Sequence, residues 1–208
     1  MRLFICLNII SNGYFIPFKE IPPKFYAHNN ASSRKHTEFV ENTIKELLEN
    51  RCIKELQEMP YCCNPLSVAE GEKLRLVIDL RHVNKYIKIN KFRYEDLRTF
   101  AEIFEQGEFF TTFDLTSGYH HVEIHPEHYK FVGFSWTQST CKTKYYVYAV
   151  LPFGLSPACY VFTKMLRPLV KKWRSSGIRS IIYIGDGIAS GDTFEQALKH
   201  AAIVRLKI

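Results

Sequence analysis

The sequence predicts a mixed fold of the α+β or α/β class, because segments with the two-residue period of strands alternate along the chain with segments that have the helical period. Hydrophobic residues make up 46% of the 208 residues and charged residues 24%, a globular composition that can form a substantial core. We find neither internal repeats nor a low-complexity tract, so repeat proteins and disordered chains are excluded.

Residues 1–34 are predicted to form an irregular extension, in which Pro17, Pro22 and Pro23 mark loops. The apolar run at 3–10 is short, Asn8 interrupts it, and no small-residue cleavage site follows, so no secretory signal is expected. The six cysteines lack Cys-x-x-Cys spacing, which favours reduced thiols. We therefore expect an intracellular protein, cytoplasmic or nuclear, without a membrane-spanning segment.

The first regular elements are a helix and a strand. Val40, Ile44 and Leu47 share one helical face, and Asn50 can end this helix in a left-handed conformation. Residues 74–81 alternate between apolar and charged side chains, which predicts a half-buried strand with a charged face. Further strands are expected at 109–115, and at 120–124 paired with 145–150.

Two more helices are predicted towards the C-terminus. Ser156 and Pro157 suit the start of the first, whose apolar stripe includes Phe162 and Trp173. Pro168 is expected to kink this helix or to end its regular part. The second helix begins at residues 192–196 with a capping-box pattern.

Residues 180–188 predict a β-hairpin, because apolar residues lead into a tight Gly-Asp-Gly turn and out again. This hairpin carries Asp186, and the upstream strand 109–115 carries Asp114 near its end. Two strands that bring carboxylates to one point are what a two-metal phosphoryl-transfer site requires. We expect the two side chains to meet in an antiparallel sheet with helices on one face, although Asp114 alone would equally suit a cap of the following turn.

Several sequence blocks in fixed order resemble the fingers and palm of reverse transcriptases from retroelements, nearest to the Ty3/gypsy and DIRS-like groups. The resemblance covers about residues 35–205. The blocks are Asn-Pro-Leu-Ser at 64–67, Arg-Leu-Val-Ile-Asp-Leu-Arg-His-Val-Asn-Lys at 75–85, Phe-Asp-Leu-Thr-Ser-Gly-Tyr at 113–119, Leu-Pro-Phe-Gly-Leu-Ser-Pro-Ala at 151–158, and the hairpin.

The resemblance implies an α+β right-hand polymerase fold, with an antiparallel palm sheet packed on helices and with no thumb within the chain. Fingers and the fingers–palm connection are expected at 35–107, and the palm at 108–208 with a fingers insertion around 125–150. The implied activity is RNA- or DNA-templated addition of deoxynucleotides to a primer 3′-OH. The implied partners are a template–primer and deoxynucleoside triphosphates, with Mg²⁺ or Mn²⁺ as cofactor.

The resemblance also assigns site residues. Asp114 and Asp186 would be the catalytic carboxylates and metal ligands, with the carbonyl of Leu115 as a further ligand. The residues that would contact the nucleotide are Lys73 and Arg75 on the triphosphate, Tyr119 under the sugar, and Phe153 and Gly154 beside the base. Taken singly, each also has an ordinary structural explanation: a solvated strand face for Lys73 and Arg75, core packing for Tyr119, and a strand-to-helix turn for Phe153 and Gly154.

The hairpin departs from the family at one position: it reads Tyr183-Ile184-Gly185-Asp186 where the family reads Tyr-x-Asp-Asp. The missing carboxylate predicts weakened metal binding and impaired synthesis. Glycine at a hairpin tip also suggests a backbone conformation that Asp adopts less easily. The alternatives are a non-catalytic nucleic-acid-binding or scaffold remnant of a retroelement, a decayed copy without function, and a sequencing error at position 185.

Charge and histidine content add two weaker hypotheses. The net charge of +7 and pI of about 9.0 suit a polyanionic partner, and a basic stripe on the helix after residue 156 could follow phosphates or simply face solvent. This stripe contains Lys164, Arg167, Lys171 and Arg174. Four histidines, namely His120, His121, His125 and His128, invite a zinc hypothesis. Strand alternation would send His120 and His121 to opposite faces, so lining positions on a strand are preferred.

Overall fold

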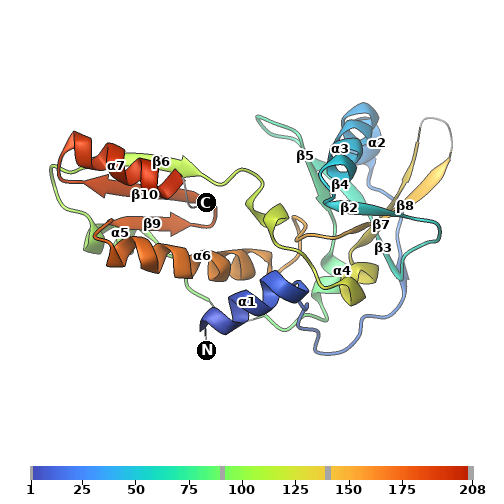
Figure 1. Cartoon of the computed structure of the whole chain (residues 1–208). Helices are drawn as coiled ribbons and strands as arrows, with labels where there is room; N and C mark the ends of the chain where they lie inside the picture. The colour runs from blue at the N-terminus through green and yellow to red at the C-terminus, as the bar shows by residue number, and fades with distance from the viewer. Residues whose placement is uncertain (1, 90–91, 139–141, 206–208) are drawn as a thin grey trace. The chain divides into compact units, whose positions relative to one another are not determined.

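The computed structural model describes residues 2–89, 92–138 and 142–205, and the chain divides into two compact units of mixed α and β structure (Figure 1). Unit 1 comprises Met1–Ile89 and Tyr119–Ala158, and unit 2 comprises Asn90–Gly118 and Cys159–Ile208. The fingers and palm boundaries proposed after residues 34 and 107 remain a prediction. No helix among the described residues has the length and apolar character needed to cross a bilayer.

Unit 1 is built on a five-stranded sheet in the order β1-β3-β7-β8-β2. The strands are β1 (Phe25–Tyr26), β2 (Ile53–Leu56), β3 (Cys62–Asn64), β7 (Gly133–Thr137) and β8 (Thr143–Tyr148). β3 pairs in parallel with β1 and β7, whereas β8 pairs antiparallel with β7 and β2. Asn64 is fully buried, and its side-chain amide donates to the carbonyls of Phe131 and Gly133, which ties β3 to the start of β7.

A separate hairpin in unit 1 pairs β4 (Leu66–Ala69) with β5 (Arg75–Ile78). β5 confirms the strand predicted at 74–81, with Leu76 and Ile78 buried and Arg75 exposed. The strand is shorter than predicted because the chain turns at Leu80 into the short helix α4 (Arg81–Asn84).

The predicted helix after residue 36 is confirmed as α3 (Thr37–Glu49), with Val40, Ile44 and Leu47 buried. The prediction that Asn50 adopts the left-handed conformation was wrong. Asn50 has φ −81°, and Arg51 takes the left-handed conformation with φ 57°.

The prediction of an irregular N-terminal extension was wrong. Residues Arg2–Asn12 form α1, and α2 (Ala31–Lys35) follows β1. α1 buries Cys6 and Ile9, three positions apart, and ends at Gly13, whose N–H donates to the carbonyl of Ile9. Gly13 has φ 80°, and a Cβ there would lie 2.7 Å from the backbone nitrogen of His125, so this close packing requires glycine.

The strand predicted at 120–124 is wrong for its first half, because residues Gly118–His121 form a 3-10 turn, η1. The predicted antiparallel pairing is present at its end. Glu123 bridges to Val150, the Ile124 N–H donates to the Ala149 carbonyl, and the Leu151 N–H donates to the Val122 carbonyl. Since His120 and His121 lie in η1, the strand-alternation argument for them does not hold. A second 3-10 segment, η2 (Pro126–Phe131), carries His128, whose Nδ1 accepts a hydrogen bond from the Ile16 N–H at 2.9 Å.

Unit 2 contains a three-stranded antiparallel sheet in the order β6-β10-β9, and the predicted hairpin is confirmed as β9 and β10. The strands are β6 (Phe109–Asp114), β9 (Ser180–Tyr183) and β10 (Asp186–Gly191). The core on one face joins Phe113, Ile182 and Ala189 to Trp173 of α6 (Ala158–Ser175) and Val204 of α7 (Phe194–Arg205). On the other face, Phe100 and Phe104 contact Phe110, so α5 (Leu97–Ile103) covers part of the face expected to lack helices.

The two C-terminal helices are confirmed. α6 runs through Pro168 to Ser175, so this proline does not end it, and the alternative, a kink at Pro168, remains a prediction. The packing of Trp173 in the core of unit 2 stabilises the turns that follow the proline. The capping pattern before α7 is confirmed: Gln196 N–H donates to Thr193 Oγ1, and Asp192 N–H donates to Gln196 Oε1.

The cysteines of the described chain include three buried free thiols, Cys52, Cys62 and Cys63. Burial raises the pKa of Cys62 to about 11, so this thiol is protonated at neutral pH. Cys141 lies outside the described residues.

Candidate active site

Two carboxylates meet at one end of the unit 2 sheet. In the antiparallel pairing of β6 with β10, Asp114 and Asp186 are register partners. Partners in such a pair carry their side chains on the same face, with Cβ atoms about 4.5–5.5 Å apart. The predicted convergence of the two strands is therefore confirmed, and both side chains are exposed. Their role as metal ligands remains a prediction.

The face that carries these carboxylates borders a largely apolar pocket of about 630 Å³ within unit 2. Its floor comes from the three strands and one wall from the start of α5. The lining residues that β6, β9 and β10 contribute include Thr112, Asp114, Ile181, Tyr183, Asp186 and Ile188. Glu95, Asp96 and Phe100 form the wall. Asp96 also caps α5, and its hydrogen bond from the Thr99 N–H lowers the pKa of its carboxyl.

Position 185 lies next to Asp114. A Cβ built on Gly185 would be 3.6 Å from Asp114 Oδ1 and 3.7 Å from the Leu115 carbonyl oxygen, which are ordinary contact distances. A side chain at this position would thus start beside the carboxylate of Asp114. The hydrogen bond from Leu115 N–H to the Gly185 carbonyl, at 3.0 Å, links the hairpin tip to the end of β6.

The expectation that Gly185 uses a backbone conformation reserved for glycine was wrong. Ile184, not Gly185, has the left-handed conformation at the tip, with φ 59°. The φ angle of Gly185 is not positive. A β-branched residue at positive φ is strained, so the hairpin tip stores its strain at Ile184.

The oxygen donors at this point fit a hard divalent cation but form an incomplete set. Asp114 and Asp186 supply carboxylates, and the Leu115 carbonyl, which also accepts from the Gly118 N–H at 3.1 Å, supplies a further oxygen. Within residues 2–89, 92–138 and 142–205, no group of three His, Cys, Asp or Glu side chains is arranged to hold a metal ion. A carboxylate at position 185 would be the third acid.

The other predicted site residues belong to unit 1. Lys73, in the connection between β4 and β5, and Arg75, at the start of β5, are exposed, and neither forms an ion pair within the described part of the chain. The rings of Tyr119 and Phe153 contact each other with centroids 5.2 Å apart. Tyr119 is 9% exposed and Phe153 is 46% exposed, so Tyr119 packs inwards, whereas Phe153 is accessible to solvent.

Gly154 has a structural requirement of its own. Its φ is 103°, and a Cβ would lie 2.5 Å from the Ile78 carbonyl oxygen. The side chain of Asn84 holds this turn, because it donates to the Gly154 carbonyl at 2.8 Å and accepts from the Ser156 N–H at 2.9 Å. Nothing in the local sequence pattern singles out Asn84 for this role. The turn explains this glycine without a nucleotide, and contact of Gly154 with a nucleotide remains a prediction.

Residues 69–207 match the reverse transcriptase (RNA-dependent DNA polymerase) family. The chain belongs to this family. Its relatives include the putative enzymatic polyprotein of cassava vein mosaic virus and the retrovirus-related Pol polyprotein from transposon 297 of Drosophila melanogaster. Each is 26% identical over 88% of this chain. The chain spans 27% and 17% of the lengths of these two polyproteins.

Solved reverse transcriptases share the fold. A crystal structure of the prototype foamy virus protease–reverse transcriptase has a TM-score of 0.70 and 23% identity, over 95% of this chain and 24% of that one. A foamy viral protease–reverse transcriptase in complex with double-stranded DNA also gives 0.70, with 22% identity over 95% of this chain and 32% of that one. The predicted retroelement reverse transcriptase domain, with its fingers and palm fold, is confirmed.

Reverse transcriptases generally use divalent metal ions, and binding of such an ion by Asp114 and Asp186 remains a prediction. The basic stripe on α6 is less suited to following phosphates. Arg167 lies over the ring of Phe92 at 5.2 Å, and Lys164 lies over the ring of Tyr160 at 5.3 Å. Arg174 forms an ion pair with Glu95. These contacts favour the interpretation of the stripe as part of the packing of unit 2.

Proposed function

We propose that this reverse transcriptase domain descends from an enzyme that adds deoxynucleotides to a primer 3′-OH by two-metal nucleotidyl transfer, and that the transfer step is impaired in this copy. One observation carries the proposal: Asp114 and Asp186 are register partners beside Gly185, where a side chain would start 3.6 Å from Asp114 Oδ1. The chain spans 27% of the cassava vein mosaic virus polyprotein and 17% of the transposon 297 polyprotein, so the activity of the whole protein is itself proposed.

Each site residue has a separate role in this proposal. Asp114, Asp186 and the Leu115 carbonyl would hold Mg²⁺ or Mn²⁺, which when bound activates the primer hydroxyl and stabilises the leaving pyrophosphate. Arg75 would make paired contacts with triphosphate oxygens, and Lys73 would act as a point charge. Tyr119 would exclude a 2′-OH by its bulk, and Phe153 would lie against the nucleotide.

The impairment follows from charge. In an intact site three carboxylates share two divalent ions, and here one of them is missing. Loss of one anionic ligand costs several kcal/mol of transition-state stabilisation, or orders of magnitude in rate. Asp186 cannot take the vacant place by a one-residue slip, since such a slip reverses every side chain of β10.

Template–primer binding requires no catalytic metal, which is why a non-catalytic nucleic-acid-binding remnant is the second candidate. A foamy viral relative was solved with double-stranded DNA, and this chain carries a net charge of +7. We expect weak binding to primed template, largely through phosphates, with affinity that falls steeply as salt rises and depends little on base sequence. Fluorescence anisotropy at several salt concentrations measures this, and binding that ignored ionic strength would contradict it.

The deciding experiment compares the chain with Gly185→Asp and with Gly185→Asn, which matches the added volume without the charge. Calorimetric Mn²⁺ titration in the presence of a deoxynucleoside triphosphate, together with single-nucleotide primer extension, gives the readouts. We expect tighter Mn²⁺ binding for Gly185→Asp alone, and slow extension by this variant when it is fused to the thumb of a complete relative. Robust extension by the unmodified chain would overturn the impairment, and no change on Gly185→Asp would overturn the metal site.

A further inference from the structure

β9, the first strand of the hairpin that carries Asp186, is an edge strand. In the order β6-β10-β9, β9 pairs with β10 on one side only. An unpaired strand edge presents backbone N–H and C=O groups that need partners. On β9 these groups include the carbonyl of Ser180 and the N–H of Ile182, which both receive partners from side chains.

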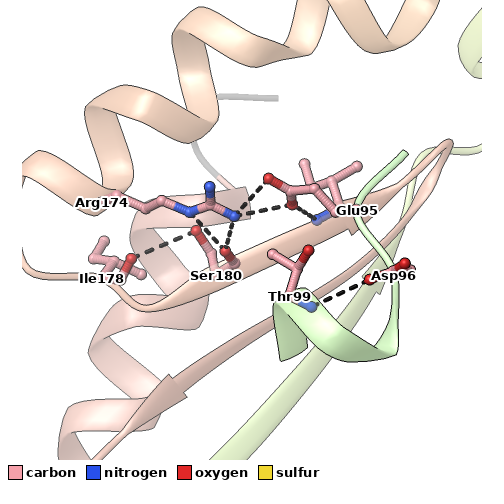
Figure 2. A network of polar contacts seen from close by, with 7 residues as sticks. Glu95, Asp96, Thr99, Arg174, Ile178 and Ser180 are labelled. Atoms are coloured by element: carbon pink, nitrogen blue, oxygen red, sulfur yellow. Dashed lines mark hydrogen bonds and ion pairs between the residues drawn. The ribbon is translucent and has the colours of Figure 1, made fainter. Parts of the chain in front are cut away.

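Figure 2 shows how Glu95 and Arg174 occupy this edge. Ile182 N–H donates to Glu95 Oε2 at 3.0 Å. Arg174 donates to the Ser180 carbonyl from Nε at 2.9 Å and from Nη2 at 2.6 Å. The same Nη2 contacts both carboxylate oxygens of Glu95, at 2.8 and 2.9 Å. Glu95 thus supplies the acceptor, and Arg174 the donor, that a neighbouring strand would otherwise supply to these two backbone groups.

This contact, which we call the clamp, anchors the free edge of β9. Successive residues of a strand point their backbone groups to alternate edges, so the groups of Ser180 and Ile182 that Arg174 and Glu95 hold face away from β10. Hydrogen bonds to charged groups are stronger than neutral ones, so their loss should loosen β9.

The clamped strand adjoins the strand that carries Asp186. Ile182 directly precedes Tyr183, the partner of Asp186 in the β9–β10 hairpin, and Asp186 in turn pairs with Asp114. Glu95 also lines the pocket that Asp114 and Asp186 border. The clamp acts two residues before Ile184, the tip residue with φ 59°.

We propose that Glu95 and Arg174 are positioning residues, which anchor β9 beside β10 and so support the hairpin that carries Asp186. The expected effect of the clamp on metal binding rests on the proposed function, whereas the contact of Glu95 and Arg174 with β9 does not. Neither residue was among the site residues that the sequence predicted.

The first test is amide hydrogen exchange by NMR on the full chain. Glu95→Ala should speed exchange at Ile182 by about tenfold or more, because a hydrogen bond to a charged group is lost, and should also speed exchange at amides paired between β9 and β10. Amides paired between β6 and β10 should change little. Glu95→Gln keeps an acceptor oxygen and should restore protection at Ile182. Glu102→Ala, at an exposed position on α5, is the matched control.

The guanidinium is tested separately. Arg174→Lys keeps the charge but loses the two-point contact with Ser180, so it should loosen the β9–β10 amides, whereas Lys171→Ala, an exposed position on the same helix, should not. Unchanged exchange in both Glu95→Ala and Arg174→Lys would overturn the clamp. Equal acceleration of every amide in unit 2 would also overturn it, since that result reports general loss of stability.

The second test adds the chemistry. In the Gly185→Asp background, Glu95→Ala should weaken Mn²⁺ binding in the presence of a deoxynucleoside triphosphate by about tenfold, and Glu95→Gln should recover most of it. Undiminished Mn²⁺ affinity in Glu95→Ala would overturn the positioning role. If Gly185→Asp itself binds no Mn²⁺, the proposed function fails, and the exchange data still decide the clamp.

Discussion

The two faces of the unit 2 sheet surround the side chains of the same hairpin differently, one with a packed core and the other with a pocket. On the closed face, Phe113 and Ile182 pack with Trp173 in a continuous core. On the open face, Asp114 and Asp186 border a pocket. Each face therefore places a different demand on its residues: close packing on one and accessible charge on the other.

Two glycines of the hairpin make this difference concrete. A Cβ on Gly187 would lie 2.0 Å from Cζ of Phe113, its register partner, so the closed face has no room for a side chain there. A Cβ on Gly185 would meet nothing closer than 3.6 Å. Packing therefore requires glycine at 187, whereas neither space nor backbone conformation requires it at 185. A side chain at position 185 would therefore fit without rearrangement of its neighbours.

The largest expected effect comes from breaking the closed face. Trp173 is 1% exposed and its ring contacts Phe113 edge-on, so Trp173→Ala should lower the free energy of unfolding by about 3–5 kcal/mol. Urea denaturation followed by circular dichroism measures this. Trp173→Phe should cost much less, because the indole N–H is buried without a hydrogen-bond partner. Equal losses in both variants would contradict the packing explanation.

Gly187→Ala should be the next most damaging change. The added methyl overlaps the Phe113 ring, and overpacking of this kind costs about 1–3 kcal/mol. The loss in denaturant midpoint should shrink when Phe113→Leu is combined with Gly187→Ala, since the ring is the obstacle. Additive effects of the two substitutions would show that the clash is relieved elsewhere.

Ile184→Asn should stabilise the hairpin tip slightly. A left-handed conformation costs an ordinary residue roughly 1–2 kcal/mol, and Asn tolerates it better than Ile does. Because Ile184 is half-buried, some apolar burial is lost, and we expect a net gain of about 0.5 kcal/mol. A clear drop in the thermal midpoint would mean that the Ile184 side chain contributes more through packing than its backbone strain costs.

Gly185→Ala should have the smallest effect, within about 0.5 kcal/mol of the parent, since the methyl makes only ordinary contacts. Measured beside Gly187→Ala under the same conditions, it compares the same substitution on the two faces. A loss at 185 as large as the loss at 187 would contradict the conclusion that the open face has room for a side chain.

The local pattern of the sequence determined much of this protein. Alternation and turn residues predicted β5, β6 and the β9–β10 hairpin, and the order of the blocks identified the family. The meeting of Asp114 with Asp186 followed from the same patterns, because strands that end in acids are local features and the family fixes their order. α3, α6 and the capped start of α7 followed from helical periodicity and capping chemistry.

Contacts between distant segments decided the rest. α1 forms where an irregular chain was expected, and it ends at Gly13 packed against the backbone at His125. Residues 118–121 turn rather than extend. Glu95 meets Arg174, 79 positions away, at the edge of β9. The space beside Gly185 depends on where Asp114 and Leu115 lie. A single sequence records which residues are present, but packing, free edges and available space depend on neighbours that only the folded chain brings together.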